Sequence, residues 1–222
     1  MTGRSVELLR RGCSRFYFVM VFTMSFAGRA HAALPDLRVN RARLANTIEF
    51  QYRNFTNASC AVAEGCVKAT GRRRLLLFDC AIANVGKADL VIGDPADRPD
   101  LFHFSPCHRH YHLNGLATYT LTRTGGTIVA RAHKQGFCLR DDERYYDNAK
   151  AAFPYVCSYQ GITTGWQDVY EKALDCQWID ITGLKPGNYV LRIAVNPAHV
   201  LKESSYSNNN VQVPVYIPKG TP

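Results

Sequence analysis

The apolar residues of the chain recur in the short patterns that are typical of β-strands. Residues 47–53 alternate apolar and polar side chains, which indicates a strand buried on one face. The continuous apolar run at 75–83 indicates a single strand buried on both faces. Further strands are predicted at 116–122, 127–132, 176–181 and 189–195.

Helical patterns are scarce. One helical turn is predicted at 148–153, and glycine- or proline-rich turns at 125–126 and 186–188 separate neighbouring strands. Neither an internal repeat nor a linker is visible. We therefore expect an all-β, sandwich-like domain with long irregular loops that disulfides must hold.

The first 32 residues follow a different pattern. A start containing four arginines precedes an apolar stretch at 16–27, and the segment ends on Ala30-His31-Ala32. This layout predicts a secretory signal peptide over 1–32 and a mature domain over 33–222. An uncleaved anchor helix is the alternative, although the apolar stretch is shorter than the roughly 20 residues that span a bilayer. We expect a secreted or periplasmic protein without stable membrane insertion after cleavage.

Charge changes this picture little. The chain carries 27 basic and 18 acidic residues, a net charge of +9. Five of the basic residues and one acidic residue lie in the predicted signal peptide, which leaves +5 on the mature domain. Such a modest excess, with one basic run at 72–74, does not indicate a nucleic-acid partner.

Cysteine content agrees with export. Cys13 belongs to the predicted signal peptide, and seven cysteines remain in the mature domain. In an oxidising compartment most of these should form disulfides, with at least one thiol left over. Spacing alone does not give their connectivity. The absence of a CxxC motif argues against zinc-ribbon and thioredoxin-like proteins.

The segment 107–112, Cys-His-Arg-His-Tyr-His, carries the clearest chemistry. On an extended strand His108, His110 and His112 would share one face, because side chains at i, i+2 and i+4 do so. Three imidazoles on one face suit copper or zinc, and the pattern alone does not choose between these metals. A surface strand that carries histidines without binding a metal is the alternative.

With its neighbouring motifs, this segment resembles the catalytic domain of the lysyl oxidase family, in the form of a bacterial-type secreted member. The resemblance runs from residue 34 nearly to the C-terminus, and its motifs lie at 107–112, 133–134, 137–139, 168–170, 175–182, 185–189 and 195–197. It implies Cu(II) at His108, His110 and His112. One departure is Ser105, which stands where animal members have a further histidine, with His103 nearby.

The resemblance also implies a cofactor made from the chain itself. Lys134 and Tyr170 match the lysine and tyrosine that form lysine tyrosylquinone, and Asp168 is the candidate base. Taken alone, none of the three would stand out. The implied activity is a copper-dependent amine oxidase of the protein-lysine 6-oxidase type. It would oxidise primary amines, including peptidyl lysine, with dioxygen to an aldehyde, ammonia and hydrogen peroxide.

The family's disulfide framework implies three pairs and one remaining thiol. The pairs are Cys60–Cys107, Cys66–Cys176 and Cys138–Cys157, and Cys80 is the remaining thiol. A further animal pair would require cysteines at positions 144 and 166, where this chain has arginine and tryptophan.

A calcium site is the last feature that the resemblance implies. Its oxygen ligands would come from Asp36, the Leu37 carbonyl, Glu203, Asn208 and Asn209, and such ligands suit Ca2+. A polar Ser/Asn loop without a metal is the alternative.

Two other functions remain open at this point. One is a non-enzymatic secreted copper-binding protein that keeps the fold without forming the quinone. The other is a zinc hydrolase, which would require an open zinc position beside a general base, and the chain has no HExxH motif.

Overall fold

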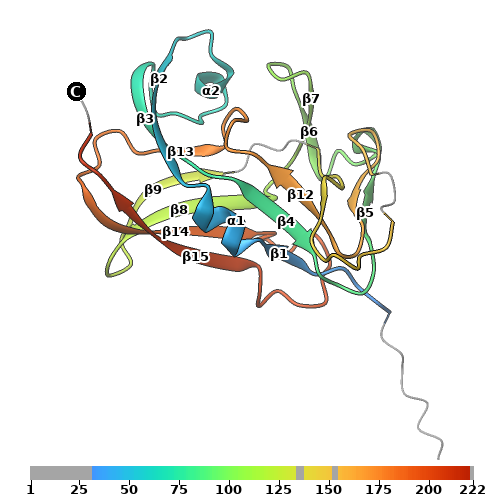
Figure 1. The fold of residues 1–222 in the computed structure, drawn as a ribbon. Helices are drawn as coiled ribbons and strands as arrows, with labels where there is room; N and C mark the ends of the chain where they lie inside the picture. The colour runs from blue at the N-terminus through green and yellow to red at the C-terminus, as the bar shows by residue number, and fades with distance from the viewer. Residues whose placement is uncertain (1–31, 134–137, 152–154, 221–222) are drawn as a thin grey trace, which may run out of the picture. The chain divides into compact units, whose positions relative to one another are not determined.

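A computed structural model describes residues 32–133, 138–151 and 155–220. By its internal contacts the chain divides into two units, Met1–Ala32 and Ala33–Pro222, and the second is described here by itself (Figure 1). The predicted signal peptide lies almost wholly outside the described residues and stays a prediction. No helix of the described part is both long and apolar enough to cross a membrane.

The described chain is built almost entirely of strands, which confirms the predicted all-β class. The strands are β1 (Leu37–Val39), β2 (Glu49–Phe55), β3 (Gly71–Leu77), β4 (Cys80–Asn84), β5 (Leu90–Gly93), β6 (Phe102–Ser105), β7 (His110–Leu113), β8 (Ala117–Arg123), β9 (Ile128–His133), β10 (Glu143–Arg144), β11 (Gln160–Ile162), β12 (Trp166–Tyr170), β13 (Trp178–Asp180), β14 (Gly187–Val195) and β15 (Asn210–Ile217). Among the residues that the structure describes, the helical elements are α1 (Arg41–Asn46), α2 (Cys60–Ala63) and the 3-10 turn η1 (Pro95–Asp97).

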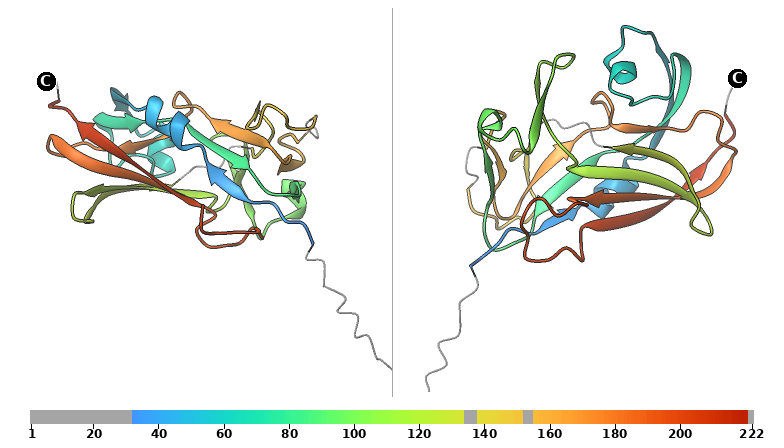
Figure 2. Two further views of the ribbon diagram at one scale, coloured as in Figure 1. Left: turned by 60° about the horizontal axis from the view of Figure 1, so that its bottom comes forward. Right: turned by 180° about the vertical axis from the view of Figure 1, so that it is seen from behind.

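The two longest strands, β14 and β15, belong to one antiparallel sheet in the order β15-β14-β8-β9. Its inner face buries apolar side chains such as Tyr119, Leu191 and Ile193. These belong to one core cluster with Leu37 and Ile82 of a second sheet, β1-β4-β12-β10. Figure 2 shows the two sheets as separate layers. The core between them gives the sandwich that the strand patterns predict.

The remaining sheets are small: β13-β3-β2, β11-β5 and β6-β7. Disulfides hold the loops around them, and the three pairs implied by the family resemblance are confirmed: Cys60–Cys107, Cys66–Cys176 and Cys138–Cys157. The buried Cys80 on β4 belongs to none of these bridges.

The single strand predicted over 75–83 is wrong, because the structure has two strands there. The chain leaves the ladder at Phe78 and Asp79 between β3 and β4. Asp79 instead accepts hydrogen bonds from the Arg43 side chain and the Lys172 amide, and donates its own amide to Thr47. Asp79 already interrupts the apolar run in sequence, and its polar contacts explain why the strand ends there.

Local signals also misplaced the helices. The expected helical turn is absent from 148–151, where the Ala149 amide closes a tight turn on the Tyr146 carbonyl; residues 152–153 lie outside the described chain. Sequence patterns missed both α1 and α2. The signal for α1 was Asn40, whose side chain caps the helix by accepting from the Arg43 amide.

Candidate metal and quinone site

The predicted histidine strand is shorter than expected. Strand β7 begins at His110, and Ser105 pairs with it across the β6–β7 hairpin. His108 lies in the preceding turn, where Arg109 adopts a left-handed backbone with φ 57°. The Ser105 carbonyl and hydroxyl accept the amides of Arg109 (2.8 Å) and His108 (3.2 Å) and so close this turn. The single extended strand through all three histidines is therefore wrong.

The three imidazoles nevertheless converge. Each of His108, His110 and His112 offers a ring nitrogen, and these atoms all lie within 4.8 Å of one another. Strand alternation explains the pair His110 and His112, whose ring centroids are 4.9 Å apart. The turn folds His108 back onto them, with its ring centroid 5.4 Å from that of His112. Such a set of three nitrogens can hold a transition metal.

The protonation of these rings suits a metal. His112 is only 1% exposed, and burial lowers its pKa to about 4 against the opposing charge of Glu64. This ring is therefore neutral near pH 7, which is the form that binds metals. The Nδ1 atom of His110 lies 3.0 Å from the His108 carbonyl, which can only accept, so Nδ1 carries the proton and Nε2 is the nitrogen whose lone pair could bind a metal.

Two carboxylates that the sequence analysis missed flank His108. Glu64 Oε1 lies 3.2 Å from its Nδ1, and Asp175 Oδ2 lies 3.4 Å from its Nε2. The Ser105 hydroxyl also donates to Glu64. Disulfide pairing was the available signal, because Glu64 lies between Cys60 and Cys66, and Asp175 adjoins Cys176. The bridges to Cys107 and from Cys66 to Cys176 bring both carboxylates to the histidines.

Strand β12 brings the predicted base and tyrosine together. Asp168 and Tyr170 are each 1% exposed and, two residues apart on this strand, lie on the same side. Both line a cavity of about 310 Å³ that His110 also lines. Figure 1 shows β12 close to the β6–β7 hairpin.

Tyr170 is a neutral phenol in this environment. Burial, reinforced by the nearby Asp168 carboxylate, raises its pKa well above the ordinary value. Its hydroxyl lies 3.5 Å from the Cys138 carbonyl, the acceptor of its long hydrogen bond. Lys134, the predicted partner of Tyr170, lies outside the described residues, four positions before Cys138 in the chain.

Comparison with known proteins agrees with this arrangement of motifs. The sequence model of the lysyl oxidase family matches residues 35–220. The chain belongs to the lysyl oxidase family. Lysyl oxidase homolog 2 of Homo sapiens is 38% identical over 187 residues, which cover 79% of this chain and 23% of the relative.

Two further relatives give the same result. Lysyl oxidase homolog 3A of Danio rerio is 39% identical over 190 residues, covering 78% of this chain and 24% of the relative. Lysyl oxidase homolog 2 of Xenopus laevis is 40% identical over 187 residues, covering 79% and 24%. The chain thus spans about a quarter of the length of these lysyl oxidase homologs.

In this lysyl oxidase family member, the residues of the predicted calcium site cluster between the start of β1 and the loop before β15. Asn208 donates to Asp36 (2.8 Å), and Glu203 accepts from the Leu37 amide and from the Asn209 side chain (2.7 Å). Burial raises the pKa of Glu203. The side-chain oxygens of Asn208 and Asn209 are buried without a hydrogen-bond partner among the described residues. Unsatisfied buried oxygens next to two carboxylates fit a hard cation.

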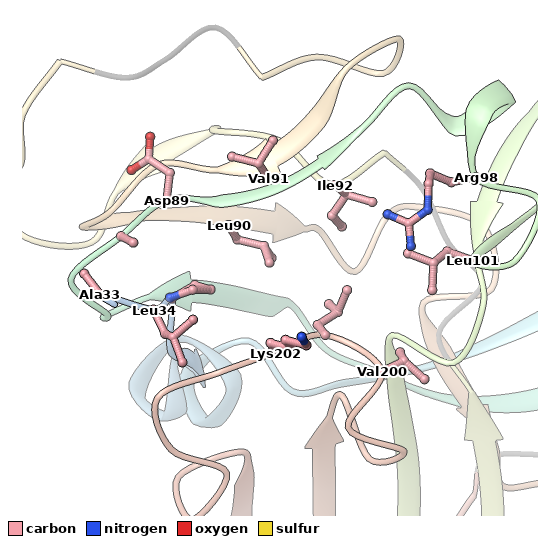
Figure 3. A pocket seen from close by; sticks show the side chains of 13 residues that line it. Ala33, Leu34, Asp89, Leu90, Val91, Ile92, Arg98, Leu101, Val200 and Lys202 are labelled. Carbon is pink, nitrogen blue, oxygen red and sulfur yellow. The ribbon is translucent and has the colours of Figure 1, made fainter. Parts of the chain in front are cut away.

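A different pocket, shown in Figure 3, has a volume of about 430 Å³. Apolar side chains such as Leu90, Ile92 and Leu101 form most of its wall, with Asp89, Arg98 and Lys202 around it. None of the predicted copper or quinone residues lines it. This pocket is larger than the cavity of about 310 Å³ at His110, Asp168 and Tyr170, but it lacks their chemistry. The smaller cavity is therefore the better candidate site.

Proposed function

We propose that the protein is a copper- and lysine tyrosylquinone-dependent amine oxidase. Its reaction would convert primary amines, including the ε-amino group of peptidyl lysine, with dioxygen and water into an aldehyde, ammonia and hydrogen peroxide. The observation that carries the proposal is the cavity shared by His110, Asp168 and Tyr170. There a metal-ligand candidate, a buried carboxylate and an oxidisable phenol line the same space.

The donor set fits the proposed metal. His108, His110 and His112 would hold it, because their nitrogens lie within 4.8 Å of one another and His112 is neutral near pH 7. Nitrogen donors alone also suit zinc, so the choice of copper follows from family membership. Copper, when bound, would supply a redox-active Lewis acid.

The proposed cofactor requires two side chains of this chain. Tyr170 would supply the ring and Lys134 a neutral amine, and the finished quinone would provide an electrophilic carbonyl. Proximity supports this pairing, because the Tyr170 hydroxyl contacts the carbonyl of Cys138, only four residues from Lys134.

Asp168 would act as the base. Its carboxylate is 1% exposed, and in such surroundings it interacts strongly with a substrate ammonium and can accept the proton from the carbon next to the amine.

The decisive experiment maps the crosslink. After incubation with copper and air, peptides bearing Lys134 and Tyr170 should be covalently joined, and quinone staining should be positive. Lys134→Arg should abolish both, because arginine stays protonated, and Tyr170→Phe should do so because no phenol remains. Both variants should still bind copper and should release no hydrogen peroxide from an alkylamine. A protein that oxidises amines without the crosslink would overturn the mechanism.

The same experiment separates the second candidate function. A copper-binding protein without enzymatic activity would bind one copper per chain, form no crosslink and release no peroxide. The histidine cluster supports copper binding in both functions, so it does not favour this alternative over the enzyme. Loss of copper in His110→Ala, measured by mass spectrometry of metal content, is expected under both functions.

We further propose that Asp36, Glu203, Asn208 and Asn209 hold Ca2+ together with the Leu37 carbonyl. The buried oxygens of the two asparagines support this site. Calcium bound there would stabilise the native state by mass action, so the melting temperature should fall when EGTA is added to calcium-loaded protein. An unchanged melting temperature would mean that this segment is a polar loop that binds no metal.

Export to the periplasm or the cell exterior is part of the proposal. The three disulfides support an oxidising compartment.

A further inference from the structure

The outer face of the sheet β15-β14-β8-β9 carries charge of one sign. Arg131 on β9 and Arg192 on β14 lie on this face, and Arg123 at the end of β8 lines the same depression although the register pairs it with the inward-facing Tyr189. The four strands have neither aspartate nor glutamate. All three arginines are exposed. The inner face of the same sheet packs into the core, so the outer face is the surface it offers to a partner.

The strand register arranges these charges around a row of hydroxyls. Thr120 on β8 pairs with Arg192 on β14 and with Arg131 on β9, so the two arginines flank it. Neighbouring strands lie about 4.8 Å apart, which separates the two arginine backbones by roughly 10 Å. Thr118 and Thr122 lie on the same face as Thr120 and line the same depression of about 570 Å³.

These arginines differ from four other arginines of the molecule. Arg43, Arg73, Arg98 and Arg140 each pair with a carboxylate. Within the described part of the chain, the three arginines of the sheet form no ion pair. Arg192 donates twice to the Asn210 side-chain oxygen (3.1 and 2.6 Å), a neutral acceptor that orients the guanidinium without cancelling its charge.

We propose that this face binds an anionic polysaccharide. Guanidinium groups pair with carboxylate or sulfate groups through two parallel hydrogen bonds. Threonine hydroxyls both donate and accept hydrogen bonds, which matches the hydroxyls of a sugar chain between its charged groups. An acidic polypeptide would satisfy the arginines but would offer the hydroxyl row fewer such partners.

Binding of defined polymers tests the proposal. The purified protein is titrated with polygalacturonate, which carries carboxylates, with dextran sulfate, which carries sulfates, and with neutral dextran. At least one charged polymer should bind, more weakly as salt rises, and neutral dextran should not bind. Whichever charged polymer binds more tightly identifies the anion that the face prefers.

Two sets of substitutions separate the face from net charge. Replacing Arg123, Arg131 and Arg192 with glutamine should weaken binding at least tenfold. A matched variant with Arg38, Lys150 and Lys202 replaced by glutamine removes the same charge from exposed positions elsewhere, and should bind within about twofold of wild type. Equal losses in both variants would overturn the proposal, and so would no binding of either charged polymer.

A third variant tests the hydroxyl row against a protein partner. Thr118, Thr120 and Thr122 are replaced with valine, which keeps the shape and the strand preference. Polysaccharide affinity should fall severalfold, whereas the weaker binding of poly-glutamate should not change. Poly-glutamate binding more tightly than either charged polysaccharide, and lost in the arginine variant, would replace the polysaccharide with an acidic protein. Circular dichroism melting verifies that each variant is folded.

Discussion

The sheet β15-β14-β8-β9 and the β6–β7 hairpin are organised by different forces. In the sheet, β14 pairs with β15 through eight consecutive residue pairs, and apolar side chains alternate into the core. The hairpin has four residue pairs, and its turn is tied to α2 by the Cys60–Cys107 bridge. Regular hydrogen bonding and burial therefore specify the first region, and covalent bridges specify the second.

This difference separates stability from chemistry. The long sheet contributes core residues but none of the predicted copper ligands or quinone residues that the structure describes. His108 lies in an irregular turn, with Arg109 in the left-handed region, whereas His110 and His112 lie on the short strand β7. A disulfide can hold such a turn without the ladder that a regular strand needs. If stability and chemistry are divided in this way, a substitution in the sheet should leave the metal site unchanged.

Removing the Cys60–Cys107 bridge should have the largest effect. Replacing both cysteines with serine releases a loop of 47 residues, which should lower the free energy of unfolding by about 4 kcal/mol. Copper stoichiometry should fall as well, because Cys107 adjoins His108. Urea unfolding and metal analysis measure the two effects. Full copper content in this variant would mean that the hairpin alone positions the histidines.

Leu191→Ala should weaken the sheet without disturbing the metal site. Leu191 is fully buried on β14, so its truncation leaves a cavity and should cost about 3 kcal/mol in the free energy of unfolding. Val190→Ala, on the partly exposed outer face, serves as the matched control and should cost about 1 kcal/mol or less. Copper per chain should stay at the wild-type value in both. A loss of copper in Leu191→Ala would show that the regions are coupled.

Asp180→Asn should remove a charged link between β13 and β3, outside both regions, costing about 2 kcal/mol at pH 7. Burial opposes ionisation of Asp180, but hydrogen bonds from the Lys68 and Thr182 amides and from Arg73 outweigh it and lower its pKa. The unfolded chain therefore binds the proton more readily. The stabilisation should be present above pH 4 and be lost as pH falls through the folded-state pKa. Denaturant unfolding of both proteins between pH 2 and pH 7 measures this; a difference that does not shrink at low pH would contradict it.

Glu64→Gln should have the smallest effect on stability, below about 1 kcal/mol, yet reduce copper affinity. Glu64 lies 3.2 Å from His108 Nδ1 and orients that ring, and loss of such a partner typically weakens metal binding about 10-fold or more. Competition with a coloured copper chelator reports the affinity. Glu171→Gln, at an exposed position, is the control. If the two variants bind copper with equal affinity, Glu64 has a structural role only.

Sequence patterns predicted what depends on local periodicity. The expected strands at 116–122 and 189–195 correspond to β8 and β14 within a few residues. Strand β15 was missed although its burial alternates regularly, because its start adjoins the Asn-rich loop assigned to calcium. The turn at His108 depends on Ser105 and a disulfide, and no strand pattern contains that information. Glu64 and Asp175 reach His108 through long-range bridges, so no local pattern indicates their proximity and the disulfide pairing was the one available signal.

The contacts between the two ends of the domain have a consequence for when it can fold. Leu37 at the first strand is bonded to Glu203, 166 residues later, and Asp36 is bonded to Asn208 across 172 residues. During synthesis Glu203 and Asn208 emerge almost last. Until then, Leu37 and Asp36 lack these two contacts, although nearly the whole domain has been made. Pairings this distant in sequence also slow folding, since a long loop must close before they form. Until the loop before β15 is released, the growing chain therefore remains a substrate for chaperones and proteases.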